Sequence, residues 1–241
     1  MSVPTRLPGP VADRLVDRVL SKAIDSGLLP EGSLPDWAGF REFRQRVRDA
    51  FQVPETSVTP LMARLFYGVA WLARPARILV VGSFYGNTLV WLAGPGFGSA
   101  PPRYSGHFAL GVDTDATAVA GARENFARLG ADHRTALRTQ DGHTVRDEPF
   151  DLVLLDADDP QRRKAVYLSL LATLRPCLAP GALVLAHDIC VPVFAEQMAR
   201  YRQVVRDNDM FASSMSMEID PCGLELSLVV DHPSALGSDA R

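Results

Sequence analysis

The chain contains a series of short apolar runs that alternate with segments of helical periodicity, and this alternation restricts the folds open to it. The runs are continuous, which is typical of strands buried on both faces of a parallel sheet. They lie at residues 77–81, 108–112, 136–139, 150–155 and 181–186. Because helical patterns separate them, right-handed strand–helix–strand crossovers and a doubly wound, mostly parallel sheet are expected.

Both ends of the chain extend this pattern. Apolar residues recur at three- and four-residue spacing over about 11–24, 35–51 and 59–72, which predicts three helices before the first strand. After residue 210 the period becomes two on either side of residues 220–223, which predicts a β-hairpin. The expected fold is α/β and Rossmann-like, with seven strands, a C-terminal antiparallel hairpin and N-terminal helices. The glycine-rich segment 94–106 is expected to be an exposed loop.

Composition and charge argue against several classes of protein. The chain is 47% hydrophobic and 22% charged, as folded globular proteins are, and its net charge of −3 offers no broad basic surface for nucleic acid. No apolar run approaches the roughly 20 residues that span a bilayer, and the N-terminus has no apolar signal segment. The three cysteines are odd in number, and their spacings fit neither a zinc knuckle nor a redox pair. We therefore expect a cytoplasmic protein that binds neither nucleic acid nor membrane.

Polar residues follow the predicted strands at the point where each strand ends. In open α/β sheets ligands bind outside these carboxyl ends. Asp113 ends the second strand and can accept hydrogen bonds from both ribose hydroxyls of a nucleoside. Asp141 ends the third and either accepts from an adenine amino group or caps a turn at Asp141–Gly142. The Gly-x-x-x-Gly turn at 82–86 fits a bound nucleoside or a simple tight turn equally well. An NAD(P)-dependent oxidoreductase would share the turn and Asp113, but would not account for the hairpin or Asp141.

Three longer segments together resemble one family. They are ILVVGSFYGNTLVWLA at 78–93, GVDTDATAVAGARENFARLG at 111–130, and FDLVLLDADDPQRRKAVYLSLLATLRPCLAPGALVLAHD at 150–188. They are similar to the motifs of class I S-adenosylmethionine-dependent methyltransferases, above all the catechol and caffeoyl-CoA type of O-methyltransferase. The resemblance runs from about residue 57 to 230. It implies methyl transfer to a small-molecule acceptor, most simply O-methylation of a hydroxyl.

The resemblance also implies domains and residue roles. Residues 59–232 would be the S-adenosylmethionine-binding domain. Outside the resemblance, we expect residues 1–58 to be a helical cap or a homodimerisation segment, because amphipathic helices must bury their apolar stripes, and 233–241 to be a flexible tail. The expected cofactor contacts are Thr59, Gly82, Ser83, Phe84, Tyr85, Gly86, Asn87, Thr88, Asp113, Thr114, Asp141, Gly142, His143 and Asp156. Asp156, His187 and Asp188 match positions that bind Mg²⁺ or another divalent metal beside the acceptor.

The sequence departs from the family at three places. Val80 replaces an acid before the first glycine, Asp159 replaces a lysine often assigned to catalysis, and His187–Asp188 replaces an Asp–Asn pair. The metal and the base therefore stay open.

Without a metal, His187 is the first candidate for a general base and His143 the second, because imidazole titrates near neutral pH. Asp156 is the third predicted catalytic residue, and Asp188 would then cap a helix. Two alternatives remain: N- or C-methylation without metal, and a methyltransferase-like protein that lacks transfer activity.

Overall fold

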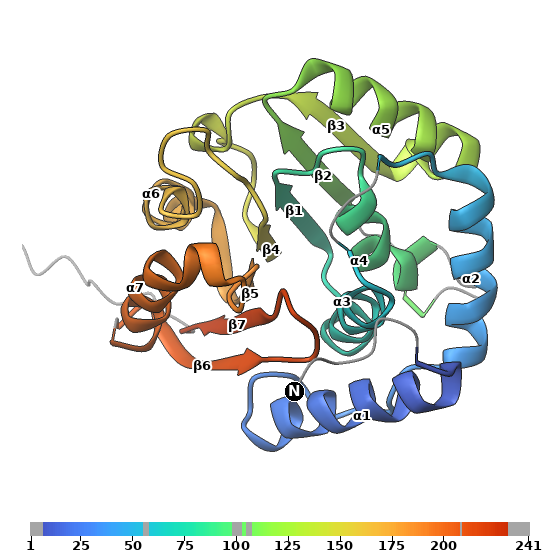
Figure 1. Cartoon of the computed structure of the whole chain (residues 1–241), viewed down its shortest axis with the longest axis horizontal. Helices are drawn as coiled ribbons and strands as arrows, with labels where there is room; N and C mark the ends of the chain where they lie inside the picture. Colours follow the sequence, from blue (N-terminus) through green and yellow to red (C-terminus); the bar gives the residue numbers. More distant parts are fainter. Residues whose placement is uncertain (1–6, 55–57, 98–102, 105–107, 208, 231–241) are drawn as a thin grey trace, which may run out of the picture.

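The computed structural model describes residues 7–54, 58–97, 103–104, 108–207 and 209–230. Its centre is one seven-stranded sheet in the order β3-β2-β1-β4-β5-β7-β6 (Figure 1). The first five strands are mutually parallel, and β7 is antiparallel to both β5 and β6. This confirms the predicted Rossmann-like fold with its terminal hairpin. The predicted tail, 233–241, lies outside the described residues.

Helices and strands alternate along the chain as the apolar pattern predicts. The strands are β1 (Arg77–Val81), β2 (Phe108–Asp113), β3 (Thr135–Thr139), β4 (Phe150–Leu155), β5 (Leu178–His187), β6 (Phe211–Met217) and β7 (Leu224–Val229). The α-helices are α1 (Gly9–Asp25), α2 (Trp37–Ala50), α3 (Pro60–Ala73), α4 (Asn87–Phe97), α5 (Ala116–Leu129), α6 (Val166–Leu174) and α7 (Ala195–Asp207). Short 3₁₀ turns include η2 (Gly142–Thr144) and η4 (Pro192–Phe194).

Two hydrophobic cores cover the two faces of the sheet. Alternate side chains of a strand point to opposite faces. Ile78 and Val80 of β1 therefore join the core beneath α1–α5, while Leu79 and Val81 join the core beneath α6 and α7. Val80, where the family resemblance led us to expect an acid, is fully buried, so a charge there would be desolvated. Figure 1 shows the two groups of helices on either side of the sheet.

The N-terminal helices bury their apolar stripes within the chain. Val16 and Leu20 of α1 belong to the same core as α3, and a Cβ on Gly68 would lie 2.6 Å from Cδ1 of Leu20. Asp13 of α1 also accepts hydrogen bonds from Arg64 of α3 and Arg41 of α2. These stripes need no partner chain to cover them, and dimerisation stays a prediction.

The predicted loop at 94–106 is wrong at its start. Helix α4 continues through Gly94, Pro95 and Gly96 to Phe97, and the first three of these are buried. Gly94 packs so closely on Phe43 of α2 that a Cβ there would lie 2.4 Å from Cε1 of the ring. Tertiary packing therefore overrides the low helix propensity of glycine and proline. Residues 98–102 and 105–107 lie outside the described part.

In the described residues, no helix combines the length and apolar character that crossing a membrane requires.

Candidate cofactor and acceptor site

A cavity of about 580 Å³ lies at the carboxyl ends of the parallel strands. Its volume suits a small-molecule ligand. Nine of the predicted site residues line it: Gly82, Phe84, Asp113, Thr114, Asp141, Gly142, His143, Asp156 and Asp188. A second cavity, of about 500 Å³, lies at the opposite end of the strands beside Asp151 and Gly181, away from these groups.

The turn from β1 to α4 forms the wall of the cavity between β2 and β4. Gly82 has a φ of 84°, and a Cβ there would lie 2.5 Å from the backbone N of Ala157. Only glycine satisfies both conditions, since the clash is with backbone that cannot swing away. Phe84 follows with a left-handed φ of 47°, and its N–H donates to Oδ2 of Asp113 at 2.7 Å. This hydrogen bond joins the turn to the end of β2.

Asp113 is held rigidly with hydrogen-bonding capacity to spare. Its Oδ2 accepts from Phe84 N, and its Oδ1 accepts from Asp115 N at 3.0 Å. Each carboxylate oxygen has two lone pairs, so each can accept one further hydrogen bond. Asp113 can therefore accept a pair of neighbouring hydroxyls from a ligand in the cavity.

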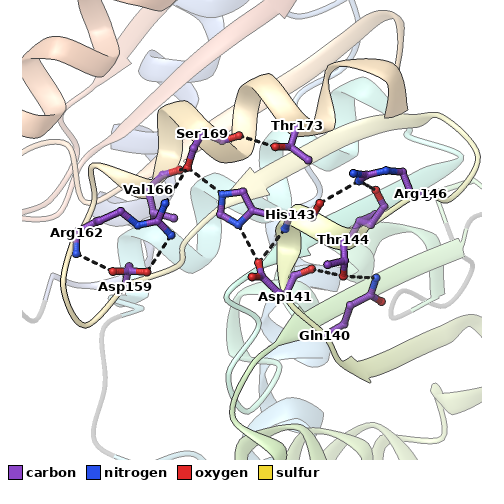
Figure 2. A network of polar contacts seen from close by, with 11 residues as sticks. Gln140, Asp141, His143, Thr144, Arg146, Asp159, Arg162, Val166, Ser169 and Thr173 are labelled. Atoms are coloured by element: carbon purple, nitrogen blue, oxygen red, sulfur yellow. Dashed lines mark hydrogen bonds and ion pairs between the residues drawn. The ribbon is translucent and has the colours of Figure 1, made fainter.

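The adjacent wall is built around His143, as Figure 2 shows. Oδ1 of Asp141 lies 2.9 Å from the backbone N and 2.8 Å from Nδ1 of His143. The backbone N–H of His143 is the main reason that the pKa of Asp141 lies below its usual value. Nε2 of His143 lies 2.8 Å from Oγ of Ser169 on α6. Both ring nitrogens are therefore engaged, so His143 bridges η2 and α6, and its role as a base stays a prediction.

The loop after β4 lines another part of the cavity. Asp159 accepts from the backbone N–H groups of Arg162 at 2.6 Å and Gln161 at 2.9 Å. Together with the Arg162 side chain, these donors lower the pKa of Asp159 to about 2, the Arg162 N–H contributing most. Asp159 thus folds the loop into a tight turn, which Figure 2 shows beside Ser169.

The same turn places Lys164, which was not predicted from the sequence, at the cavity. Lys164 is 2% exposed, and its Nζ lies 2.8 Å from Oδ2 of Asp188 and 3.7 Å from Oδ1 of Asp156. The family resemblance implies a lysine at position 159, where this chain has aspartate. One signal was available: of the 25 basic Lys and Arg residues, only Lys22 and Lys164 are lysine.

His187 lies behind the cavity wall, which corrects our expectation of an accessible base. Its side chain is fully buried, and its Nδ1 lies 3.0 Å from Oδ1 of Asp156. Its Nε2 has no hydrogen-bond partner within the described structure. Burial opposes the charged imidazole, but Asp156 outweighs it, together with Cys222 and Asp188, so the pKa of His187 lies well above its usual value.

Six predicted cofactor residues do not line this cavity: Thr59, Ser83, Tyr85, Gly86, Asn87 and Thr88. Tyr85 and Gly86 instead pack against α5. The Tyr85 ring lies so close to Gly121 that a Cβ there would be 2.5 Å away. A Cβ on Gly86 would likewise lie 2.7 Å from the Phe126 ring. Ser83 is buried, and Asn87 and Thr88 begin α4. Thr59 caps α3 and hydrogen-bonds Asp220.

The residues predicted to bind a metal lie together, but most of their oxygen atoms are already paired, which does not fit a hard divalent cation such as Mg²⁺. One oxygen of Asp188 is paired with Lys164, and Oδ1 of Asp156 lies against His187. Among the described His, Cys, Asp and Glu residues, only one set of three has its potential ligand atoms within 4.8 Å of one another. That set is His187, Asp188 and Cys222. Hard cations such as Mg²⁺ require several oxygen ligands, which this group of one imidazole, one carboxylate and one thiol does not supply.

Comparisons with known proteins identify the fold. No protein-family model matches the chain, and no curated protein matches its sequence. Solved structures do match. The O-methyltransferase from Bacillus cereus in complex with SAH is 16% identical, with a TM-score of 0.59 over 89% of this chain and 99% of that one.

Two further structures match in the same way. The O-methyltransferase TomG from Streptomyces achromogenes, involved in tomaymycin synthesis and solved with SAM, is 18% identical, with a TM-score of 0.59 over 91% of this chain and 98% of that one. A putative caffeoyl-CoA O-methyltransferase from Staphylococcus aureus is 15% identical, with a TM-score of 0.59 over 89% and 98%. At these identities the likeness establishes a shared fold.

Proposed function

We propose that this protein transfers a methyl group from S-adenosylmethionine to a hydroxyl of a small-molecule acceptor. One observation carries the proposal: two carboxylates at the ends of neighbouring strands, Asp113 and Asp141, share a cavity with a charged cluster of Asp156, Asp188 and Lys164. The first pair suits a nucleoside and the second group suits a reacting hydroxyl. Solved proteins of this fold include O-methyltransferases with bound SAH and SAM, which supports the assignment.

The residues present fit the cofactor. Asp113 would accept the two ribose hydroxyls, and Asp141 with Gly142 would lie beside the adenine. Gly142 is packed so tightly that a Cβ would lie 2.4 Å from Cγ1 of Val81. The backbone of Gly82, which has no side chain, lines the cavity at the end of β1. When bound, S-adenosylmethionine supplies an electrophilic methyl group on a sulfonium ion.

The charged cluster would prepare the acceptor. A phenol has a pKa near 10, so at neutral pH its hydroxyl must lose a proton as the oxygen–carbon bond forms and the carbon–sulfur bond breaks. The ammonium of Lys164 favours the oxygen anion by its charge. The carboxylates of Asp156 and Asp188, which line the same wall, are placed to receive the proton. Holding the acceptor in line contributes up to ~7–11 kcal/mol to such a reaction.

Calorimetry tests the cofactor assignment. Wild-type protein should bind S-adenosylmethionine and S-adenosylhomocysteine but not NADH. Asp113→Ala removes two charge-assisted hydrogen bonds of roughly 1.5–3 kcal/mol each, so affinity should fall by about 10²–10⁴-fold. Asp132→Ala, an exposed acid on the 3₁₀ turn before β3, is the matched control.

The same experiment can contradict the proposal. Absence of adenosyl binding, or clear NADH binding, would remove the cofactor assignment and leave only the fold. Binding of S-adenosylmethionine without transfer to any hydroxyl acceptor would instead indicate a methyltransferase-like protein without transfer activity.

A further inference from the structure

The ammonium of Lys164 lies where two carboxylates and two aromatic rings converge. Its Nζ contacts Asp188 at 2.8 Å and lies 3.7 Å from Asp156. It also donates to Oη of Tyr167 at 3.0 Å and lies 5.6 Å from the ring centroid of Phe194. The side chain is 2% exposed, yet Lys164, Asp156 and Asp188 all line the cavity. A buried positive charge therefore faces the ligand space.

Its hydrogen bonds leave one donor for a ligand. An ammonium has three N–H donors. Asp188 takes one, at a length typical of a charge-assisted bond, and Tyr167 takes another. Oδ1 of Asp156, at 3.7 Å, is too far to accept the third. The third N–H is thus available to an oxygen in the cavity.

The residue type is itself informative. Of the 25 Lys and Arg residues, only two are lysine: Lys164 and Lys22, which lies near the end of α1. Lysine carries a compact point charge, whereas the guanidinium of arginine is a broad planar fork. The buried position between Asp156 and Asp188 therefore holds the smaller of the two cations, the one closer in size to a metal ion.

We propose that the Lys164 ammonium occupies the place of a divalent cation between Asp156 and Asp188, so that the acceptor oxygen is bound by Lys164 and the site works without metal. The part that concerns the acceptor rests on the function proposed above. A divalent ion ligated to Asp188 would lie 2.0–2.6 Å from its oxygen and hence a few ångströms from Nζ, where like charges repel strongly. The single free N–H holds one oxygen, so the acceptor class is a single hydroxyl and not a chelating vicinal pair.

Binding of Mn²⁺ to the full chain, followed by electron paramagnetic resonance without cofactor, tests the substitution. Wild-type protein and Lys22→Ala should show no binding at millimolar Mn²⁺. Lys164→Ala removes the ammonium and leaves the two carboxylates unpaired, so its Mn²⁺ affinity should rise by roughly tenfold or more. Adding Asp188→Asn to Lys164→Ala should abolish that gain.

Two outcomes would overturn the proposal: wild-type protein that binds Mn²⁺ as tightly as Lys164→Ala, or a folded Lys164→Ala that binds it no better than wild type. Thermal unfolding gives a second readout, because Mn²⁺ should raise the Tm of Lys164→Ala but not that of Lys22→Ala. If Lys164→Ala does not fold, the wild-type Mn²⁺ titration still decides, since tight wild-type binding contradicts the proposal and its absence supports it. Calorimetry with S-adenosylhomocysteine is independent, so loss of the cofactor assignment would be recognised separately.

Discussion

The carboxylate of Asp13 offers a test of how the N-terminal helices are fixed to the rest of the chain. It pairs with two arginines of different exposure. Oδ1 lies 2.7 Å from Nε of Arg64, whose side chain is 5% exposed, and Oδ2 lies 2.8 Å from Nη1 of Arg41, which is 51% exposed. We consider Asp13→Asn, which keeps the shape of the side chain and removes its charge.

The two ion pairs should differ widely in energy. Breaking a buried pair leaves an uncompensated charge, which costs about 3–5 kcal/mol. Arg64 would be left with the carbonyl of Pro60, 2.9 Å from its Nη1, and the ring of Phe40. An exposed pair contributes about 0–1 kcal/mol. A domain of this length loses about 2–4 °C in Tm per kcal/mol, so Asp13→Asn should lower Tm by about 6–20 °C and Arg41→Ala by less than about 4 °C.

Differential scanning calorimetry measures both variants against wild type at neutral pH. Arg41→Ala is the matched control, because it removes a partner of the same carboxylate from the solvent side. If Asp13→Asn lowers Tm no more than Arg41→Ala does, then the Asp13–Arg64 pair does not fix α1 to α3, and the reasoning from burial is refuted.

Three more predictions concern the wall around His143. Gly142→Ala places a Cβ 2.4 Å from Val81, so it should lower the free energy of unfolding by about 1–3 kcal/mol and weaken S-adenosylhomocysteine binding in calorimetry; unchanged values would contradict the tight packing. His143→Ala and Ser169→Ala break the same hydrogen bond, so each should cost about 0.5–1.5 kcal/mol and the double variant less than their sum in a denaturant cycle. The pKa of Asp141 is lowered by the His143 N–H, so its contribution to stability is present above the unfolded pKa and is lost as pH falls through the folded pKa. Asp141→Asn should therefore lose less stability than wild type on acidification below about pH 4, and parallel acid limbs in a Tm–pH series would contradict this.

The fold was largely predictable because its signals are local. Continuous apolar runs predict buried strands, and the change to period two predicts the hairpin of β6 and β7. The error at Gly94 has a physical cause: the helix is stabilised there by contact with Phe43, some fifty residues earlier in the chain. No local pattern encodes such a contact.

The candidate site was predictable only in part, for the same reason. Asp113 and Asp141 lie in the cavity because they end parallel strands, which the sequence already indicates. His187 also ends a strand, but the next residue, Asp188, has a φ of 66°, and it is Asp188 that lines the cavity. Lys164 reaches the site only because Asp159 folds the preceding loop into a turn. The spacing of residues in the sequence predicts neither the backbone conformation at Asp188 nor the turn that brings Lys164 to the site.

The position of β7 has a consequence for how the chain can fold as it is synthesised. Leu224–Val229 is the last strand of the described residues, yet it lies inside the sheet, paired with β5 on one side and β6 on the other. While β6 has left the ribosome and β7 has not, β5 has no neighbour on that side and β6 has no strand to pair with. Ribosomes add about 5–20 residues per second, and exposed, unpaired strand edges are prone to aggregation, so this interval is the one in which a nascent chain would most need a chaperone.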